Sequence, residues 1–288
     1  MDISIQMNKI FIILFFVIAS KISAQNQRFI YEYKYIPDST KVDSILTENM
    51  RLTIFKDHSE FLSEMKAKRD SAILKSSQKG NREIGTDLSS GNIRSMVWKN
   101  KNNLKNYSTE FIGMESYKVI DETDLNWELI DETKKIQNYN CQKAMLKFGD
   151  REWTAWFTTE LPFQDGPHLF RKLPGLIVAI EDSRKHHSFQ LIANYKTNEG
   201  TSVIKPFHLL KDYEVNRKQF NKKWNDFRKN PISSNEQFLL MNPQIISFKS
   251  YDENGNEIDA NNFKRAGIEK ARKNLVKNNN FLDLALYK

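Results

Sequence analysis

Two adjacent histidines, His186 and His187, follow the acidic pair Glu181 and Asp182 and could bind a transition metal. Neutral imidazole and carboxylate groups are ligands that such metals accept. Adjacent side chains on a strand point to opposite sides, however, so the two histidines would chelate one ion poorly. They also lack the helical His-to-His spacing of a hydrolytic zinc site. The sequence therefore favours a solvated hairpin tip here, and neither a metal nor a cofactor is predicted.

The single cysteine, Cys141, is the only thiol that could act as a nucleophile. A reactive thiol needs a base and a positive environment, yet Cys141 lies between Asn140 and Gln142, and the histidine closest in sequence is His168. A small, buried apolar role is therefore favoured. The chain contains no G-x-S-x-G, P-loop, G-x-G-x-x-G or H-E-x-x-H motif. A hydrolytic or redox enzyme that uses Cys141 or His168 is the alternative function.

Aromatic side chains gather between residues 153 and 170, at Trp153, Trp156, Phe157, Phe163 and Phe170. Alternation along a strand puts Trp153 and Phe157 on one face and Trp156 on the other. One tryptophan could thus face a concave surface or solvent. An apolar cleft there would suit a lipid, a peptide or another small hydrophobic ligand. Packing in the core is the competing interpretation.

The N-terminal residues indicate export. Lys9 precedes an uncharged run from Ile10 to Ser20, and small residues follow at Ser23 and Ala24. The run is too short to span a bilayer, and the pattern is typical of a secretory signal peptide. We expect residues 1–24 to be the signal, cleaved after Ala24, and no transmembrane segment in the mature chain. No cysteine stands at the cleavage point, so the protein is predicted to lack a lipid anchor and to be periplasmic or secreted.

The formal net charge of +8 could favour anionic partners. Nucleic acid is not expected as a partner outside the cytoplasm. The basic residues are interpreted as dispersed along the chain rather than massed, and therefore as solvated surface charge.

Period-two alternation predicts a series of strands. The first covers residues 28–36 and puts Phe29, Tyr31, Tyr33 and Tyr35 on one side. The others are predicted at residues 49–55, 93–99, 106–113, 116–122, 126–130, 137–148, 152–161, 176–181 and 188–196. Polar turns separate those after residue 93, as in an antiparallel meander, and Gly149-Asp150-Arg151 should close a hairpin.

Three segments show helical periodicity instead. The first helix is predicted from Asp57 or Ser59, either of which could be its N-cap, to about Lys75. The second would begin after a cap at Asp212 and end before Pro231. Four aromatic residues share one side of it, a pattern more typical of a core than of a ligand site: Tyr213, Phe220, Trp224 and Phe227. The third covers residues 261–276. We expect one domain, residues 25–288, with its C-terminal helical part at about 206–288.

The segment from Trp153 to Asp182 resembles the signature of the GLPGLI family, a group of exported proteins of Gram-negative bacteria. The resemblance rests on Ala155-Trp156-Phe157-Thr158, Glu160-Leu161-Pro162, Gly166-Pro167, Phe170 and Leu173-Pro174-Gly175-Leu176-Ile177. Residues 127–129, 131–134 and 139–144 also resemble the family pattern. The resemblance implies an exported protein of unassigned biochemical activity, and it supplies no catalytic residues.

Two departures from that pattern stand out. His168-Leu169 occupies the place of the usual Tyr-Lys, and Lys172 replaces the first glycine of the hexapeptide. Proline followed by glycine predicts a type II turn at residues 173–176, with a positive φ at Gly175. Asp165-Gly166-Pro167 predicts a second tight turn. We interpret these turns as shaping the chain rather than as a binding rim.

These patterns predict an α+β fold: a long, curved antiparallel sheet that could form a partial barrel, with one inserted N-terminal helix and two C-terminal helices. The predicted function is non-enzymatic binding of an apolar or peptide ligand, or of an envelope protein partner, by an exported protein. The candidate binding residues are Trp153, Trp156, Phe157, Gly166, Pro167, His168, Phe170, Pro174 and Gly175.

Overall fold

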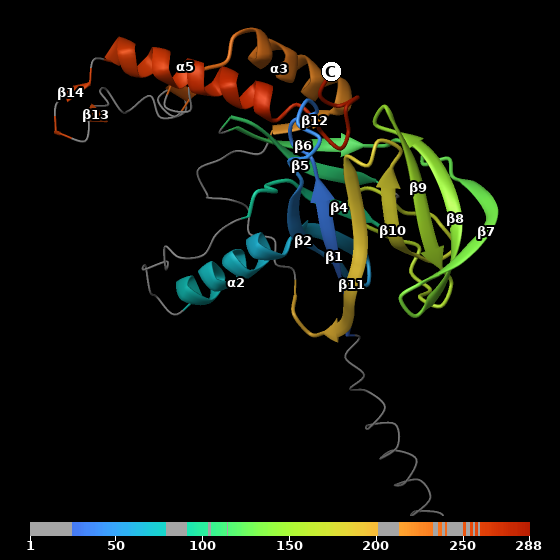
Figure 1. Cartoon of the computed structure of the whole chain (residues 1–288). Helices are drawn as coiled ribbons and strands as arrows, with labels where there is room; N and C mark the ends of the chain where they lie inside the picture. The colour runs from blue at the N-terminus through green and yellow to red at the C-terminus, as the bar shows by residue number, and fades with distance from the viewer. Residues whose placement is uncertain are drawn as a thin grey trace, which may run out of the picture.

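The computed structural model describes residues 25–78, 91–102, 105–113, 115–200, 213–232 and 260–288, with residues 236, 237, 240, 250, 251, 254, 255, 257 and 258. The predicted signal peptide lies outside the described residues. Within them, twelve strands form one sheet in the order β12-β6-β5-β4-β3-β2-β1-β11-β10-β9-β8-β7. The sheet is strongly curved, and the fold is α+β as predicted (Figure 1).

Most strands of this sheet lie where predicted, but β3 and β12 fall in segments predicted as helix, and β7 extends to Ile136 rather than residue 130. Their bounds are β1 Asn26–Tyr35, β2 Leu46–Ile54, β3 His58–Ser63, β4 Met96–Asn100, β5 Asn106–Ile112, β6 Glu115–Asp121, β7 Glu128–Ile136, β8 Tyr139–Phe148, β9 Arg151–Thr158, β10 Leu176–Asp182, β11 His187–Thr197 and β12 Tyr213–Asn216. Neighbouring strands are antiparallel, except that β12 runs parallel to β6. A separate short pair joins β13 Ser250–Tyr251 to β14 Glu257–Ile258.

The hairpin between β8 and β9 forms where predicted. Phe148 pairs with Arg151, and both loop residues, Gly149 and Asp150, have positive φ (+62° and +58°). Two consecutive positive φ values define the type I′ turn, whose twist matches that of paired strands.

The first helix begins later than the sequence predicts. Residues 58–63 form β3, paired with β2 and β4, and α2 covers Glu64–Gln78. The β3 segment contains only two adjacent apolar residues, Phe61 and Leu62, which fit either period over so short a stretch; both are buried on the strand instead. The hydroxyl of Ser63, not Asp57 or Ser59, accepts the Lys66 amide hydrogen at 3.3 Å and caps the helix.

The two C-terminal helices lie side by side at one end of the sheet (Figure 1). They are α3, Arg217–Lys229, and α5, Ala260–Lys277. The predicted helix start is wrong, because Tyr213 lies on β12 and a capping box of Asn216 and Gln219 opens α3. Phe220 and Trp224 pack with Tyr117 and Leu286 in a small hydrophobic cluster.

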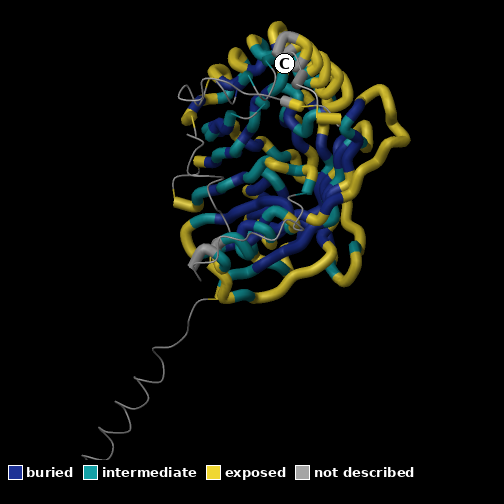
Figure 2. Tube along the Cα trace, turned by 90° about the vertical axis from the view of Figure 1, so that its left-hand side faces the viewer, coloured by how far each residue is buried: buried dark blue, intermediate teal, exposed yellow. Residues whose placement is uncertain are grey.

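The larger core is formed mainly by side chains of β1, β2, β8, β9, β10 and β11 with the residues that connect β9 to β10, and buried residues gather in the interior of the molecule (Figure 2). Phe29 and Tyr31 of β1 are fully buried there. Residues 159–175, which connect β9 to β10 and are called the crossing segment below, pack inside the curve of the sheet. Asp165 accepts the Ser59 hydroxyl hydrogen at 2.6 Å from the β3 side, and the Phe170 ring lies 4.8 Å from the Trp153 ring on the β9 side. The crossing segment therefore joins the two halves of the sheet.

Candidate functional site

A cavity of about 380 Å³ lies on the concave side, between strands β1 to β5, β11 and the C-terminal residues 278–287. We call it the inner cavity. Six phenylalanine and tyrosine side chains line it: Tyr33, Tyr35, Phe61, Phe189, Phe281 and Tyr287. Polar and charged residues also line it, among them His168, His187, Glu110, Asp283 and Arg217. Aromatic walls that carry polar groups to orient a ligand are common in small-molecule sites.

His187, the first residue of β11, is 1% exposed and presents a hydrogen-bonding atom without a partner. Its Nδ1 lies 2.7 Å from the Tyr33 hydroxyl, and its backbone amide donates to Asp182 Oδ1 at 2.8 Å. Nε2 is buried and makes no hydrogen bond of good geometry in the described part of the chain, although the Asn280 backbone acts on the ring and opposes the fall of its pKa. Burial, reinforced by the charge of Arg151, holds the pKa of His187 well below its ordinary value. The ring is therefore neutral at neutral pH.

His168 enters the same cavity from the crossing segment. It lies in a turn closed by the Phe170 amide, which donates to Pro167 O at 3.1 Å, and its φ is +50°. Its Nδ1 is also buried without a partner in the described structure. Burial, together with the positive charge of Lys99, lowers the pKa of His168 to about 3.

Glu110 of β5 supplies the third polar group. It accepts hydrogens from the Tyr287 hydroxyl at 2.7 Å and the Ser95 hydroxyl at 2.8 Å. Burial raises the pKa of Glu110, since a charged carboxylate is poorly solvated there. The inner cavity thus disfavours charge on both histidines and on Glu110. The charges of Arg217 and Asp283, which also line it, are paired with each other at 2.6 Å, so the cavity suits a neutral ligand.

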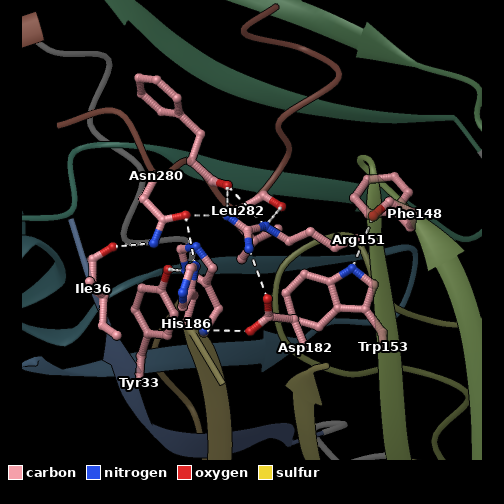
Figure 3. A network of polar contacts seen from close by, with 11 residues as sticks. Tyr33, Ile36, Phe148, Arg151, Trp153, Asp182, His186, Asn280 and Leu282 are labelled. Carbon is pink, nitrogen blue, oxygen red and sulfur yellow. Dashed lines mark hydrogen bonds and ion pairs between the residues drawn. The ribbon is translucent and has the colours of Figure 1, made fainter. Parts of the chain in front are cut away.

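A buried network fixes the C-terminal residues that close the cavity (Figure 3). Arg151 donates to Asp182 Oδ2 at 2.8 Å, to Asn280 Oδ1 at 2.6 Å and to the Phe281 carbonyl at 2.7 Å. Asn280 in turn donates to the Ile36 carbonyl at 2.7 Å. Arg151 therefore attaches the chain end to β9 and β10, and Asn280 attaches it to Ile36, just after β1.

The predicted aromatic binding residues have other surroundings. Trp153, Phe157 and Phe170 are at most 1% exposed and belong to the core, where the Trp153 indole donates to Phe148 O at 3.0 Å. Trp156 is 7% exposed, and Lys134 Nζ lies 3.9 Å from its ring centroid, a cation–π contact. None of these four residues lines the inner cavity; among the predicted site residues, His168 does.

The glycines and prolines of the crossing segment serve close packing. A Cβ on Gly175 would lie 1.9 Å from the Thr158 carbonyl oxygen, and one on Gly166 would lie 2.8 Å from the Ile177 side chain. The predicted type II turn after Leu173 is wrong: Gly175 has no positive φ, and the Leu176 amide donates to Leu161 O at 3.0 Å instead. The second turn is also displaced, since it spans residues 167–170 rather than 165–167.

The positive φ values occur where the sequence departs from the GLPGLI pattern. His168 has φ +50° and Lys172 has φ +77°. Lys172 stands at the position of the first glycine of the hexapeptide, so the backbone there has the geometry that glycine adopts most easily.

Cys141 lies in the larger core and is 1% exposed. Burial raises the pKa of its thiol to about 11, which is the opposite of nucleophile activation. No group of three or more His, Cys, Asp or Glu side chains able to hold a metal occurs among the described residues.

Sequence reasoning did not find the inner cavity itself. The predicted solvated hairpin tip is wrong for His187, which is buried, and nothing in the sequence indicated that Glu110 or residues 278–288 belong to a site. The available signals were weak: an aromatic cluster at Phe281 and Tyr287, and a histidine that opens a strand.

The comparison with protein families agrees with the resemblance in kind. Residues 147–179 match a family described as "Protein of unknown function (Porph_ging)". The match covers β9, the crossing segment and the beginning of β10. No curated protein matches the chain.

Among solved structures, the chain is similar to PNGF-II. In one crystal form the identity is 14% and the TM-score 0.47, over 69% of this chain and 33% of PNGF-II. In a second form the identity is 15% with the same TM-score. The chain thus spans about a third of the length of PNGF-II, which is also β-rich.

Proposed function

We propose that this chain is an exported cell-envelope protein that binds a small, mainly apolar, neutral ligand in the inner cavity without transforming it. Export is supported by the signal-like N-terminal residues alone. Among the helices that the structure describes, none combines the length and apolar character needed to cross a membrane. The binding role is supported by the shape, lining and charge preference of the cavity.

The observation that carries the proposal is the unpartnered Nε2 of His187. Leaving a buried donor or acceptor unpaired costs about 1–3 kcal/mol, so such atoms usually have a partner. A ligand with one hydroxyl, carbonyl or amide group could bond this nitrogen while its apolar part contacts the aromatic wall. Such a ligand gains affinity from burial and orientation from the single polar contact.

The enzymatic alternative has less support. A histidine with a pKa of about 3 is a weak base at neutral pH, whereas general acid–base catalysis is most efficient when the pKa lies near the operating pH. Cys141 lies outside the cavity lining and its thiol is deactivated by burial. Binding without catalysis uses the same neutral groups without requiring proton transfer.

Native mass spectrometry of the protein purified from its own envelope fraction tests the proposal. We expect a discrete bound mass in the wild type, reduced at least severalfold in two variants of the cavity wall. His187→Phe removes the hydrogen-bonding nitrogen. Ile93→Trp replaces a partly buried residue of the cavity wall by a larger one, which fills part of the cavity.

The matched control is His58→Phe, because His58 stacks on Trp98 at 3.8 Å and does not line the cavity. Thermal unfolding establishes that each variant is folded before its ligand content is compared. A bare wild-type mass, or an adduct retained by both folded cavity variants, would reject the inner cavity as the binding site.

A further inference from the structure

The positive charge of the chain is concentrated on the two C-terminal helices, contrary to the expectation that it is dispersed. Helices α3 and α5 together contain twelve lysine and arginine residues against two acidic ones, Asp226 and Glu269. Their excess of ten positive charges exceeds the +8 of the whole chain, so the remainder is slightly acidic. Because α3 and α5 lie side by side at one end of the sheet (Figure 1), this end of the molecule is strongly basic.

An apolar groove of about 630 Å³ lies between these helices and β5. Aromatic and aliphatic side chains form its floor: Phe111, Trp224, Phe227, Leu275, Phe281 and Tyr287. The α5 side presents the small residues Ala266, Gly267 and Ala271, which leave the groove open along the helix. The groove is distinct from the inner cavity, although Phe281 and Tyr287, stacked at 3.9 Å, contribute to both walls.

Two basic residues line the groove without neutralising partners. Neither Arg94 nor Lys270 forms an ion pair with a carboxylate in the described part of the chain; Arg94 Nη1 donates to the Gly113 carbonyl at 3.4 Å. The Arg94 guanidinium lies 4.0 Å from the Phe111 ring centroid, directly beside the apolar floor. By contrast, Arg217 of α3 is turned inward to Asp121 and Asp283, each at 2.6 Å. Arg94 and Lys270 are therefore placed to receive an anion.

We propose that the basic helices α3 and α5 dock on an anionic lipid membrane surface, with one acyl chain in the groove and its headgroup at Arg94 and Lys270. Helices that combine basic and apolar groups bind such surfaces through both the anionic headgroups and the acyl region. The exposed Val276 of α5, 67% exposed, adds an apolar contact beside the basic residues.

The apolar groove favours lipid over nucleic acid as the partner. Single-stranded nucleic acid stacks its bases on exposed aromatic faces, but Trp224 is only 6% exposed and its indole donates to Tyr287 O at 2.9 Å. Its neighbours Phe281 and Tyr287 meet it edge to face. The aromatic rings line a floor suited to a hydrocarbon chain and leave no stacking platform.

Vesicle flotation with the full chain tests the docking surface. We expect binding to vesicles of phosphatidylcholine with phosphatidylglycerol, little binding to phosphatidylcholine alone, and weaker binding as salt is raised. The double variant Arg94→Gln/Lys270→Gln should lower affinity about tenfold. Lys34→Gln/Lys147→Gln removes the same charge from exposed sheet residues and should change it little.

A second arm separates docking in the groove from simple adsorption to charge. Leu275→Asn lowers the apolar character of the groove at constant charge and should also weaken binding severalfold. The groove would have no role if Leu275→Asn left binding unchanged while the groove double variant and the sheet double variant weakened it equally. Binding to a duplex oligonucleotide but not to anionic vesicles would replace the lipid with nucleic acid and overturn the proposal.

Discussion

Lys99 of β4 and Asp165 of the crossing segment form an ion pair inside the protein. Lys99 is 0% exposed, and its Nζ also donates to the Gly166 carbonyl at 2.6 Å. Burial lowers the pKa of Lys99, while the charge of Asp165 opposes that shift. The pair connects β4 to the crossing segment that follows β9, so it stabilises the packing of that segment inside the curve of the sheet.

Replacing Lys99 by methionine should lower the free energy of unfolding by about 3–5 kcal/mol, because Asp165 would remain as a buried, unpaired charge. Denaturant unfolding measures the loss. Lys34→Met is the control, since Lys34 and Glu32 form an exposed pair at 2.8 Å whose loss should cost less than about 1 kcal/mol. Asp165→Asn combined with Lys99→Met should cost less than the sum of the single changes; strict additivity would show that the pair is not coupled.

Gly175→Ala should destabilise the protein severely, by roughly 3 kcal/mol or more, because overpacking against rigid backbone cannot relax cheaply. The added Cβ would meet the Thr158 carbonyl oxygen at 1.9 Å. Gly200→Ala is the matched change, as no atom lies within 4 Å of a Cβ there. Equal stability of the two variants in thermal unfolding would contradict the close approach at Gly175.

At position 172 a glycine variant should be more stable than an alanine variant, the reverse of the order found at most positions. An L-residue in the left-handed region costs roughly 1–2 kcal/mol, and Lys172 has φ +77°. Lys172→Gly and Lys172→Ala both lose the exposed ion pair with Asp124, so their difference isolates the backbone. We expect the glycine variant to be more stable by about 1 kcal/mol in denaturant unfolding. An alanine variant of equal or higher stability would be incompatible with this geometry.

The sequence predicted the sheet well and the site poorly, for physical reasons. Alternation along β1, β8 and β9 determines which side chains are buried, so the strands and the hairpin at Gly149 could be located. The start of α2 could not, because Phe61 and Leu62 satisfy both periods within a short segment. The inner cavity depends on His168, His187 and Tyr287, which come from distant parts of the chain and meet only after the sheet curves.

The thiol of Cys141 should be almost unreactive in the folded protein. Raising its pKa from 9.0 to about 11 lowers the thiolate fraction about a hundredfold at mildly alkaline pH, and burial blocks access as well. Reaction with an aromatic disulfide reagent should be slow until denaturant is added and then complete. A fast, pH-dependent reaction of the native protein would restore the cysteine-enzyme hypothesis.

Mild acid should destabilise the protein through its buried histidines, and His168 offers a way to measure this. Its pKa is about 3 in the folded protein and 6.5 ordinarily. Between these pH values the ring is protonated in the unfolded chain but neutral in the folded protein. The stability that His168 contributes is complete above pH 6.5 and is lost as pH falls toward 3, by about 1.4 kcal/mol per unit. Glu110, whose pKa is raised above 4.5, acts in the opposite direction, because the folded protein binds its proton more readily than the unfolded chain does.

His168→Asn removes the titrating ring but keeps a residue that tolerates positive φ. Between pH 6.5 and 5 its free energy of unfolding should therefore fall less steeply than that of the wild type. Part of the slope should persist, because burial also lowers the pKa of His187. Lys185→Asn, at another position with φ +57°, should keep the wild-type slope. Identical slopes in the wild type and His168→Asn would mean that His168 is not held neutral, and a charged ring at this position would make the inner cavity unsuitable for a neutral ligand.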